Sequence, residues 1–168
     1  MIHAFHISNG KVSYLNRWMR TVKWKKEHEE QKALWSSGMD VMNNDPSVSN
    51  IETDGLANTA IVSHAGKIFA LEEAHAPFEF DQMTLESRGS YSFNNKLQGP
   101  VTAHPKIDPI TGELLFFGYM ADGFFSDTIR YTAVSKDGNI SKSELIKAPF
   151  PSMVHDFFAT KKYIIIPV

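Results

Sequence analysis

The sequence predicts an all-β fold built from short strands. Short apolar, β-branched and aromatic segments recur along the chain at spacings of about ten residues. Turn residues separate these segments, including the pairs Asn9-Gly10, Ala65-Gly66 and Asp137-Gly138. Regularly spaced short strands with turns of this kind are typical of β-sandwiches and β-propellers.

The N-terminal part of the chain predicts a hairpin, then a helix, then a loop. Residues 2–7 alternate apolar and polar side chains and residues 12–16 return after Asn9-Gly10, which is a β-hairpin signal. Residues 23–34 are rich in Lys, Glu and Gln and carry opposite charges four positions apart, so we expect a solvent-exposed helix. Glycine, asparagine and proline interrupt residues 36–55, which predict a loop.

The rest of the chain predicts a series of short strands. In chain order they cover residues 59–64, 68–72, 77–80, 89–93, 114–119, 130–134, 140–146 and 163–166.

Composition sets the class of protein. With 168 residues, 42% hydrophobic and 21% charged, the chain can form one globular domain. A net charge of −2 gives no reason to expect a nucleic-acid partner. The chain has no cysteine, which excludes disulfides and thiolate chemistry and fits a reducing compartment, so we expect a cytoplasmic protein. We expect neither a signal peptide nor an integral membrane span, because no apolar run approaches about 20 residues.

Two segments hold a histidine at the start of a strand. In TAHPKIDPITGELLFFGY (residues 102–119), Pro105 favours an extended conformation for His104 before the turn that leads to the apolar strand. In PSMVHDFFAT (residues 151–160), His155 precedes a second apolar run. A histidine in this position is either packed in a core or a metal ligand. Asp156 follows His155 directly and would point to the opposite face, so we expect it to support a neighbouring backbone.

These two segments resemble the carotenoid cleavage oxygenases, the family that includes apocarotenoid and lignostilbene dioxygenases. The resemblance extends to residues 57–59, 64–67 and 77–85 and covers most of the chain from about residue 17. In this family, histidines in the TAHPK and HDF contexts are the first two of four that hold non-haem Fe(II). The resemblance therefore implies that His104 and His155 are iron ligands, and that the other two lie in parts of the family that this chain lacks.

The resemblance also implies a seven-bladed β-propeller. A blade takes about 40–50 residues, so 168 residues supply three to four blades. We expect residues 1–168 to form a single partial propeller domain, incomplete at both ends and mainly at the C-terminal one. Without the missing C-terminal propeller segment, such a piece would expose strand edges and part of its core.

The resemblance implies a glutamate behind one of the histidines. Family members place a glutamate about thirty residues before the first ligand, where it fixes the ring of an iron-bound imidazole. Residues 71–74 occupy that place, and the following Pro77 and Phe78 favour Glu73 over Glu72. The alternative for Glu73 is a solvent-facing charge in a loop. His64 and His75 are not assigned to iron.

For the reaction, the resemblance implies cleavage of a conjugated C=C bond of a small apolar substrate by O2, giving two carbonyl products. The lignostilbene branch binds a substrate phenol through a tyrosine and a lysine, but Met42 and Glu72 stand in those places here. Glu72 has the wrong charge for a phenolate, so an apocarotenoid and a stilbenoid both stay open. Aromatic residues that could line the substrate cavity, with blade cores as the alternative, are Phe93, Phe124, Phe125, Phe150 and Phe157.

We expect the partial chain to be inactive alone, because it carries two of four ligands. The alternative function is a catalytically inactive β-propeller-like binding or scaffold fragment. Convergence of the His104 and His155 imidazoles would favour the enzyme, and divergence would favour the scaffold.

Overall fold

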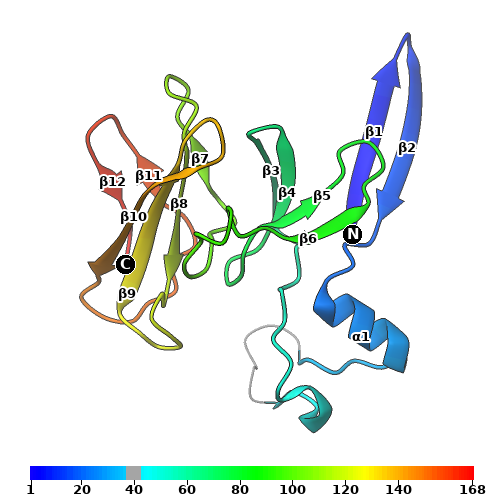
Figure 1. The fold of residues 1–168 in the computed structure, drawn as a ribbon, viewed down its shortest axis with the longest axis horizontal. Coiled ribbons are helices and arrows are strands. Elements are labelled where there is room, and N and C mark those ends of the chain that lie inside the picture. The colour runs from blue at the N-terminus through cyan, green and yellow to red at the C-terminus, as the bar shows by residue number, and fades with distance from the viewer. Residues whose placement is uncertain (37–42) are drawn as a thin grey trace.

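The computed structural model describes residues 1–36 and 43–168 (Figure 1). Its elements in chain order are β1 Ile2–Ser8, β2 Lys11–Arg17, α1 Val22–Glu30, a short 3-10 helix Pro46–Val48, β3 Ala60–His64, β4 Lys67–Leu71, β5 Phe78–Phe80, β6 Ser87–Ser90, β7 Lys106–Ile107, β8 Leu114–Tyr119, β9 Thr128–Val134, β10 Ile140–Lys147, β11 Phe158–Ala159 and β12 Ile164–Ile165. The prediction of an all-β chain with one short surface helix is confirmed.

Two four-stranded antiparallel sheets form the body of the molecule. Their strand orders are β3-β4-β5-β6 and β10-β9-β8-β7, so each sheet is a meander in which sequential strands are neighbours. The β1–β2 hairpin and the β11–β12 pair add two-stranded pieces on either side (Figure 1). The first strands of successive units, β3, β7 and β11, follow one another at intervals close to the about 40–50 residues of a propeller blade. Two complete sheets and two partial ones fit the expected three to four blades.

Strand β8 explains why the chain forms successive sheets rather than one isolated sheet. Its side chains alternate between faces, and both faces are buried, as its nearly continuous apolar sequence predicts. Phe116 packs with Phe93 and Val101 toward the sheet that contains β3. Phe117 packs with Ile129 and Phe157 toward the segment that leads to β11.

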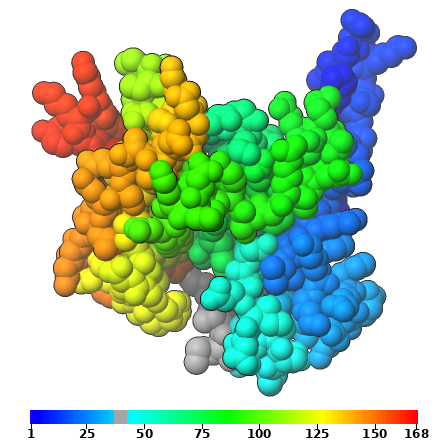
Figure 2. Space-filling model, in the orientation of Figure 1, coloured from blue at the N-terminus to red at the C-terminus, as the bar shows by residue number. Residues whose placement is uncertain are grey.

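The N-terminal hairpin is confirmed and extends away from the body (Figure 2). Strands β1 and β2 pair in a register that places Phe5 opposite Tyr14 and Ile7 opposite Val12. All four of these side chains are more than half exposed. The base of the hairpin is packed instead, since Ile2 lies in a core cluster with Ala70 and Phe80.

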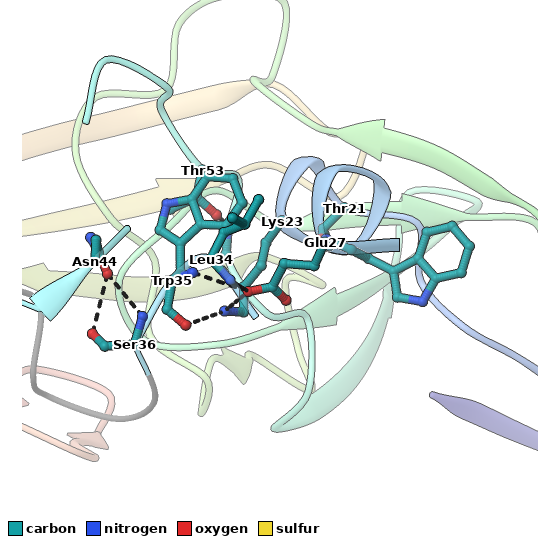
Figure 3. Close-up of polar contacts among 10 residues, drawn as sticks. Thr21, Lys23, Glu27, Leu34, Trp35, Ser36, Asn44 and Thr53 are labelled. Atoms are coloured by element: carbon teal, nitrogen blue, oxygen red, sulfur yellow. Dashed lines mark hydrogen bonds and ion pairs between the residues drawn. The ribbon is translucent and has the colours of Figure 1, made fainter. Parts of the chain in front are cut away.

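The helix ends earlier than predicted. Helix α1 stops at Glu30, and the left-handed residue Gln31 follows it, whereas the prediction extended to residue 34. The carboxylate of Glu27 explains this end, because it accepts hydrogen bonds from the backbone N–H groups of Leu34 and Trp35 at 2.9 and 3.1 Å (Figure 3). These bonds turn the chain back so that both side chains are buried beside Val48. Helix α1 itself contains no buried residue, as expected for a solvent-exposed helix.

One predicted strand is displaced. Residues 89–93 were expected to be a strand, but β6 covers Ser87–Ser90 and the chain then leaves the sheet. Phe93, Asn94 and Asn95 adopt positive φ angles of 50°, 60° and 61°, which no strand contains. This turn directs Phe93 into the core between the two sheets, so burial of one aromatic ring prevails over continued strand pairing.

Within the described part of the chain, no helix is long and apolar enough to cross a membrane.

Candidate metal centre

Three loops bring the candidate site together. His104 lies just before β7 and His155 just before β11, so each precedes the first strand of its unit. Glu73 follows β4, which runs antiparallel to β3, so that β4 ends where the first strand of its sheet begins. The three side chains are the described group that could hold a metal ion, with one ligand atom of each within 4.8 Å of the others.

The two histidines converge. The Nε2 atoms of His104 and His155 lie 2.9 Å apart, and their ring centroids are 4.5 Å apart at an interplanar angle of 63°. Two imidazole nitrogens bound to one ion at about 2.1 Å lie about 3 Å apart when they occupy neighbouring corners of an octahedron. The observed separation therefore suits a shared ion without movement of either segment.

Glu73 fixes the orientation of the His155 ring. Its carboxylate lies in direct contact with Nδ1 of His155, as in an ion pair. A proton on Nδ1 would place the lone pair of His155 on Nε2, the nitrogen that contacts Nε2 of His104. The hydroxyl of Tyr119 donates a longer hydrogen bond of 3.4 Å to the other Glu73 oxygen. Burial and the negative charge of Glu73 raise the pKa of Tyr119, which keeps this hydroxyl protonated as a donor.

Asp156 has the supporting role that its position predicts. Its carboxylate accepts a hydrogen bond of 2.7 Å from the backbone N–H of Phe157 and forms an ion pair of 2.7 Å with Lys106. These contacts lower the pKa of Asp156, although partial burial acts in the opposite direction.

The hydrogen bond from Tyr119 to Glu73 could not be expected from sequence, because a tyrosine at the end of an apolar strand gives no sign of its partner.

The two unassigned histidines lie outside the group. His64 is buried, and its Nε2 contacts the backbone oxygen of Gly112 at 3.0 Å. His75 donates from Nδ1 to the carboxylate of Glu72. This hydrogen bond raises the pKa of His75 against the opposing effect of burial.

The candidate substrate-lining aromatics are scattered. Phe157 is 1% exposed and packs edge-to-face on Phe117 at a centroid distance of 5.2 Å. Phe93 is also buried, whereas Phe124 and Phe150 are 68% and 53% exposed. Phe124 contacts Phe125, which is itself exposed. Within these 168 residues Phe157 and Phe93 act as core residues, and the contact of Phe124 and Phe150 with a substrate stays a prediction.

A cavity of about 630 Å³ is lined in part by Glu72 and His75, the neighbours in sequence of Glu73. Trp35, Val48, Ile51 and Leu56 give it an apolar wall. Its polar side carries Lys23, Asn44, Glu72 and His75, and Figure 3 shows several residues of this region. The volume is in the range of small-molecule sites. Glu72 therefore does face a cavity, while Met42 lies outside the described residues.

Comparison with known proteins supplies the family. The model of the RPE65 family, described as retinal pigment epithelial membrane protein, matches residues 1–168. The chain belongs to this family. This confirms the resemblance to the carotenoid oxygenases inferred from the two histidine segments.

Relatives within the RPE65 family include enzymes named for small aromatic substrates. Isoeugenol monooxygenase of Pseudomonas nitroreducens is 36% identical over all of this chain and 35% of its own length. Lignostilbene-alpha,beta-dioxygenase isozyme III of Sphingomonas paucimobilis is 34% identical over 98% of this chain and 34% of its own length. The crystal structure of Pseudomonas brassicacearum lignostilbene dioxygenase superposes with a TM-score of 0.92 at 35% identity, over 99% of this chain and 34% of its own. The present chain thus spans about a third of the length of these RPE65-family relatives.

Proposed function

We propose that this chain is part of a non-haem Fe(II) dioxygenase that cleaves a conjugated C=C bond of an apocarotenoid or stilbenoid. One O2 molecule would give one oxygen atom to each alkene carbon, so that the products are two carbonyl compounds. Membership of the RPE65 family and relatives named as lignostilbene and carotenoid cleavage dioxygenases support the reaction class.

The convergence of His104 and His155 carries the proposal. Their Nε2 atoms lie 2.9 Å apart and belong to segments of different sheets, which ordinary strand pairing would not bring together. Imidazole is a ligand that suits iron, and a proton held on Nδ1 of His155 by Glu73 would leave its Nε2 available to the ion. A scaffold protein has no need for this arrangement, so the inactive-scaffold alternative has less support.

His104 and His155 would be two ligands, and two further histidines would come from outside these 168 residues. Bound Fe(II) would supply the activation of O2 beside the alkene. Within this chain, Glu73 would keep the proton on Nδ1 of His155 and hold its ring in place. Tyr119 would hold the Glu73 carboxylate through its hydroxyl. The side chain of His155 is 69% exposed here, so this chain alone would not exclude water from the site, and we expect it to be inactive alone.

Anaerobic titration with Fe(II) tests the proposal. We expect one equivalent to bind to the wild-type chain and binding to weaken strongly in His104→Ala and in His155→Ala. His28→Ala is the matched control, since His28 is an exposed histidine on α1. Binding that is absent, or equal in all four proteins, would favour the scaffold function instead.

A further inference from the structure

A buried hydroxyl joins the backbones of the two histidine positions. Thr102 is 2% exposed, and its Oγ1 accepts a hydrogen bond of 3.1 Å from the backbone N–H of His104. The same hydroxyl donates its proton to the backbone oxygen of His155 at 3.4 Å. One side chain thus links the two segments at the residues whose imidazoles meet.

Thr102 is anchored independently of this link. Its backbone N–H donates to the oxygen of Phe117 in β8 at 2.7 Å, which fixes it to the second sheet. Loss of the hydroxyl would therefore leave residues 101–103 in place. It would remove one restraint on His155, which stands in an irregular segment before the two-residue strand β11.

An ion pair provides a second link between the same segments. Lys106, two positions after His104, contacts the carboxylate of Asp156, next to His155, at 2.7 Å. The Lys106 ammonium also lies 5.4 Å from the ring centroid of Phe157, the buried residue that anchors the His155 segment on Phe117. The side chains of Lys106 and Asp156 are 34% and 52% exposed, so solvent screens much of the attraction within this pair.

We propose that Thr102 and the Lys106–Asp156 ion pair are positioning residues that hold His104 and His155 at chelating distance. This inference rests on the proposed function, because it assigns a purpose to the imidazole contact. The two histidines belong to different units, and among the described contacts these links are the polar ones that join residues 102–106 directly to residues 155–157 apart from the imidazoles themselves. Support outside the ligand set commonly changes metal affinity by about 10–100-fold.

Titration of the chain with Co(II), used as a spectroscopic substitute for Fe(II), provides the first test. We expect Thr102→Val, which keeps the shape but removes the hydroxyl, to weaken Co(II) binding about tenfold. Thr102→Ser should retain near wild-type affinity. Lys106→Met and Asp156→Asn should each weaken binding, and the double variant should be no weaker than either single one, because both changes break the same pair.

Lys67→Met is a matched control for Lys106→Met. Lys67 has the same side-chain exposure of 34%, forms an ion pair of 2.9 Å with Glu79 and lies 4.9 Å from the Tyr91 ring centroid, but it is on β4 in the first sheet. Lys67→Met should lower the free energy of unfolding of the metal-free chain at least as much as Lys106→Met, because the Glu79 side chain is 10% exposed and the Asp156 side chain 52%. Only Lys106→Met should change Co(II) affinity. Equal effects of the two variants on affinity would mean that the pair acts through stability and would overturn the inference.

Nitrogen NMR of the metal-free chain separates failure of this inference from failure of the proposed function. Long-range ¹H–¹⁵N spectra of the imidazoles should show the His104–His155 contact in the wild type and its loss in Thr102→Val. If the wild type binds no Co(II) but shows this contact, the metal function fails while the positioning role stands. If Thr102→Val keeps both the contact and the wild-type affinity, the positioning role is wrong.

Discussion

The carboxylate of Glu73 and the Nδ1 atom of His155 contact each other directly, although Glu73 follows β4 in the first sheet and His155 precedes β11. The strands of the second sheet, β7 to β10, lie between these two residues along the chain. The contact places a negative charge behind the imidazole whose other nitrogen faces His104. A carboxylate in this position makes the imidazole more basic, and so a stronger metal ligand, and limits rotation of the ring.

Replacement of Glu73 should weaken metal binding more than it weakens the fold. We expect Glu73→Ala to lower Co(II) affinity by about 10–100-fold and Glu73→Gln by less, because an amide oxygen still accepts the Nδ1 proton but carries no charge. Titration followed by absorbance measures both variants. Glu72→Gln is the control, since Glu72 faces His75 and the adjacent cavity. Equal affinity in all four proteins would show that Glu73 is only a loop charge.

A second prediction concerns the close approach of the His104 segment to β8. Gly118 has no Cβ, and a Cβ built there would overlap the carbonyl oxygen of Pro100 and lie 2.8 Å from its carbonyl carbon. Gly118→Ala should therefore push residues 100–104 away from β8, at a cost of about 1–3 kcal/mol in the free energy of unfolding. It should also lower metal affinity, because Thr102 and His104 move with that segment.

Gly66→Ala is the comparison for this glycine. Gly66 has a φ of +73° with open space around its Cβ position, so alanine there costs about 1 kcal/mol of backbone strain without a steric clash. Urea unfolding and Co(II) titration of the two variants together separate the effects. Unchanged metal affinity in Gly118→Ala would mean that the His104 segment tolerates the displacement.

Much of the fold follows from local sequence signals. The I′-type turn at Asn9-Gly10 and the alternating residues around it specify the β1–β2 hairpin without any distant partner. The apolar run of β8 indicates a strand buried on both faces. His104 and His155 could be singled out because each precedes an apolar strand in a family-like motif, and Glu73 because of its spacing from them.

The parts that could not be predicted depend on contacts between distant residues. The residues directly after Glu30 include no Gly or Pro that would signal the end of helix α1. It is the Glu27 carboxylate that captures the backbone of Leu34 and Trp35. Phe93 leaves its predicted strand because a core between two sheets is available to it. In the sequence Thr102 is an ordinary strand-favouring residue. Its hydrogen bond to His155, 53 residues away, depends on the tertiary structure.

A buried and an exposed phenylalanine should differ sharply in their contribution to stability. Phe117 is fully buried against Ile129 and Phe157, so Phe117→Ala should lower the free energy of unfolding by about 3–5 kcal/mol. Phe124→Ala is the same substitution at a ring that is 68% exposed and should change it by at most about 0.5 kcal/mol. Thermal unfolding followed by circular dichroism compares them. A large loss in Phe124→Ala would reveal packing that its exposure does not suggest.

The His75–Glu72 pair gives the chain a predictable pH dependence. The hydrogen bond to Glu72 raises the pKa of His75 above its unfolded value, although burial opposes this. The backbone of Gly55 packs directly against the pair, where a Cβ would lie 2.9 Å from His75 Nδ1. Because the folded state holds the proton more tightly, the pair stabilises the fold fully below the unfolded pKa of about 6.5. This contribution is lost as the pH rises through the folded pKa.

His75→Gln should therefore cost more stability at low pH than at high pH. We expect the difference from wild type in the free energy of unfolding to be on the order of 1 kcal/mol at pH 6 and to shrink steadily as the pH is raised above 6.5. Urea unfolding at a series of pH values measures it. In a Glu72→Gln background the same substitution should lose its pH dependence, since the partner that holds the proton is gone. A difference that grows with pH would mean that His75 is stabilised as the neutral imidazole and that burial outweighs Glu72.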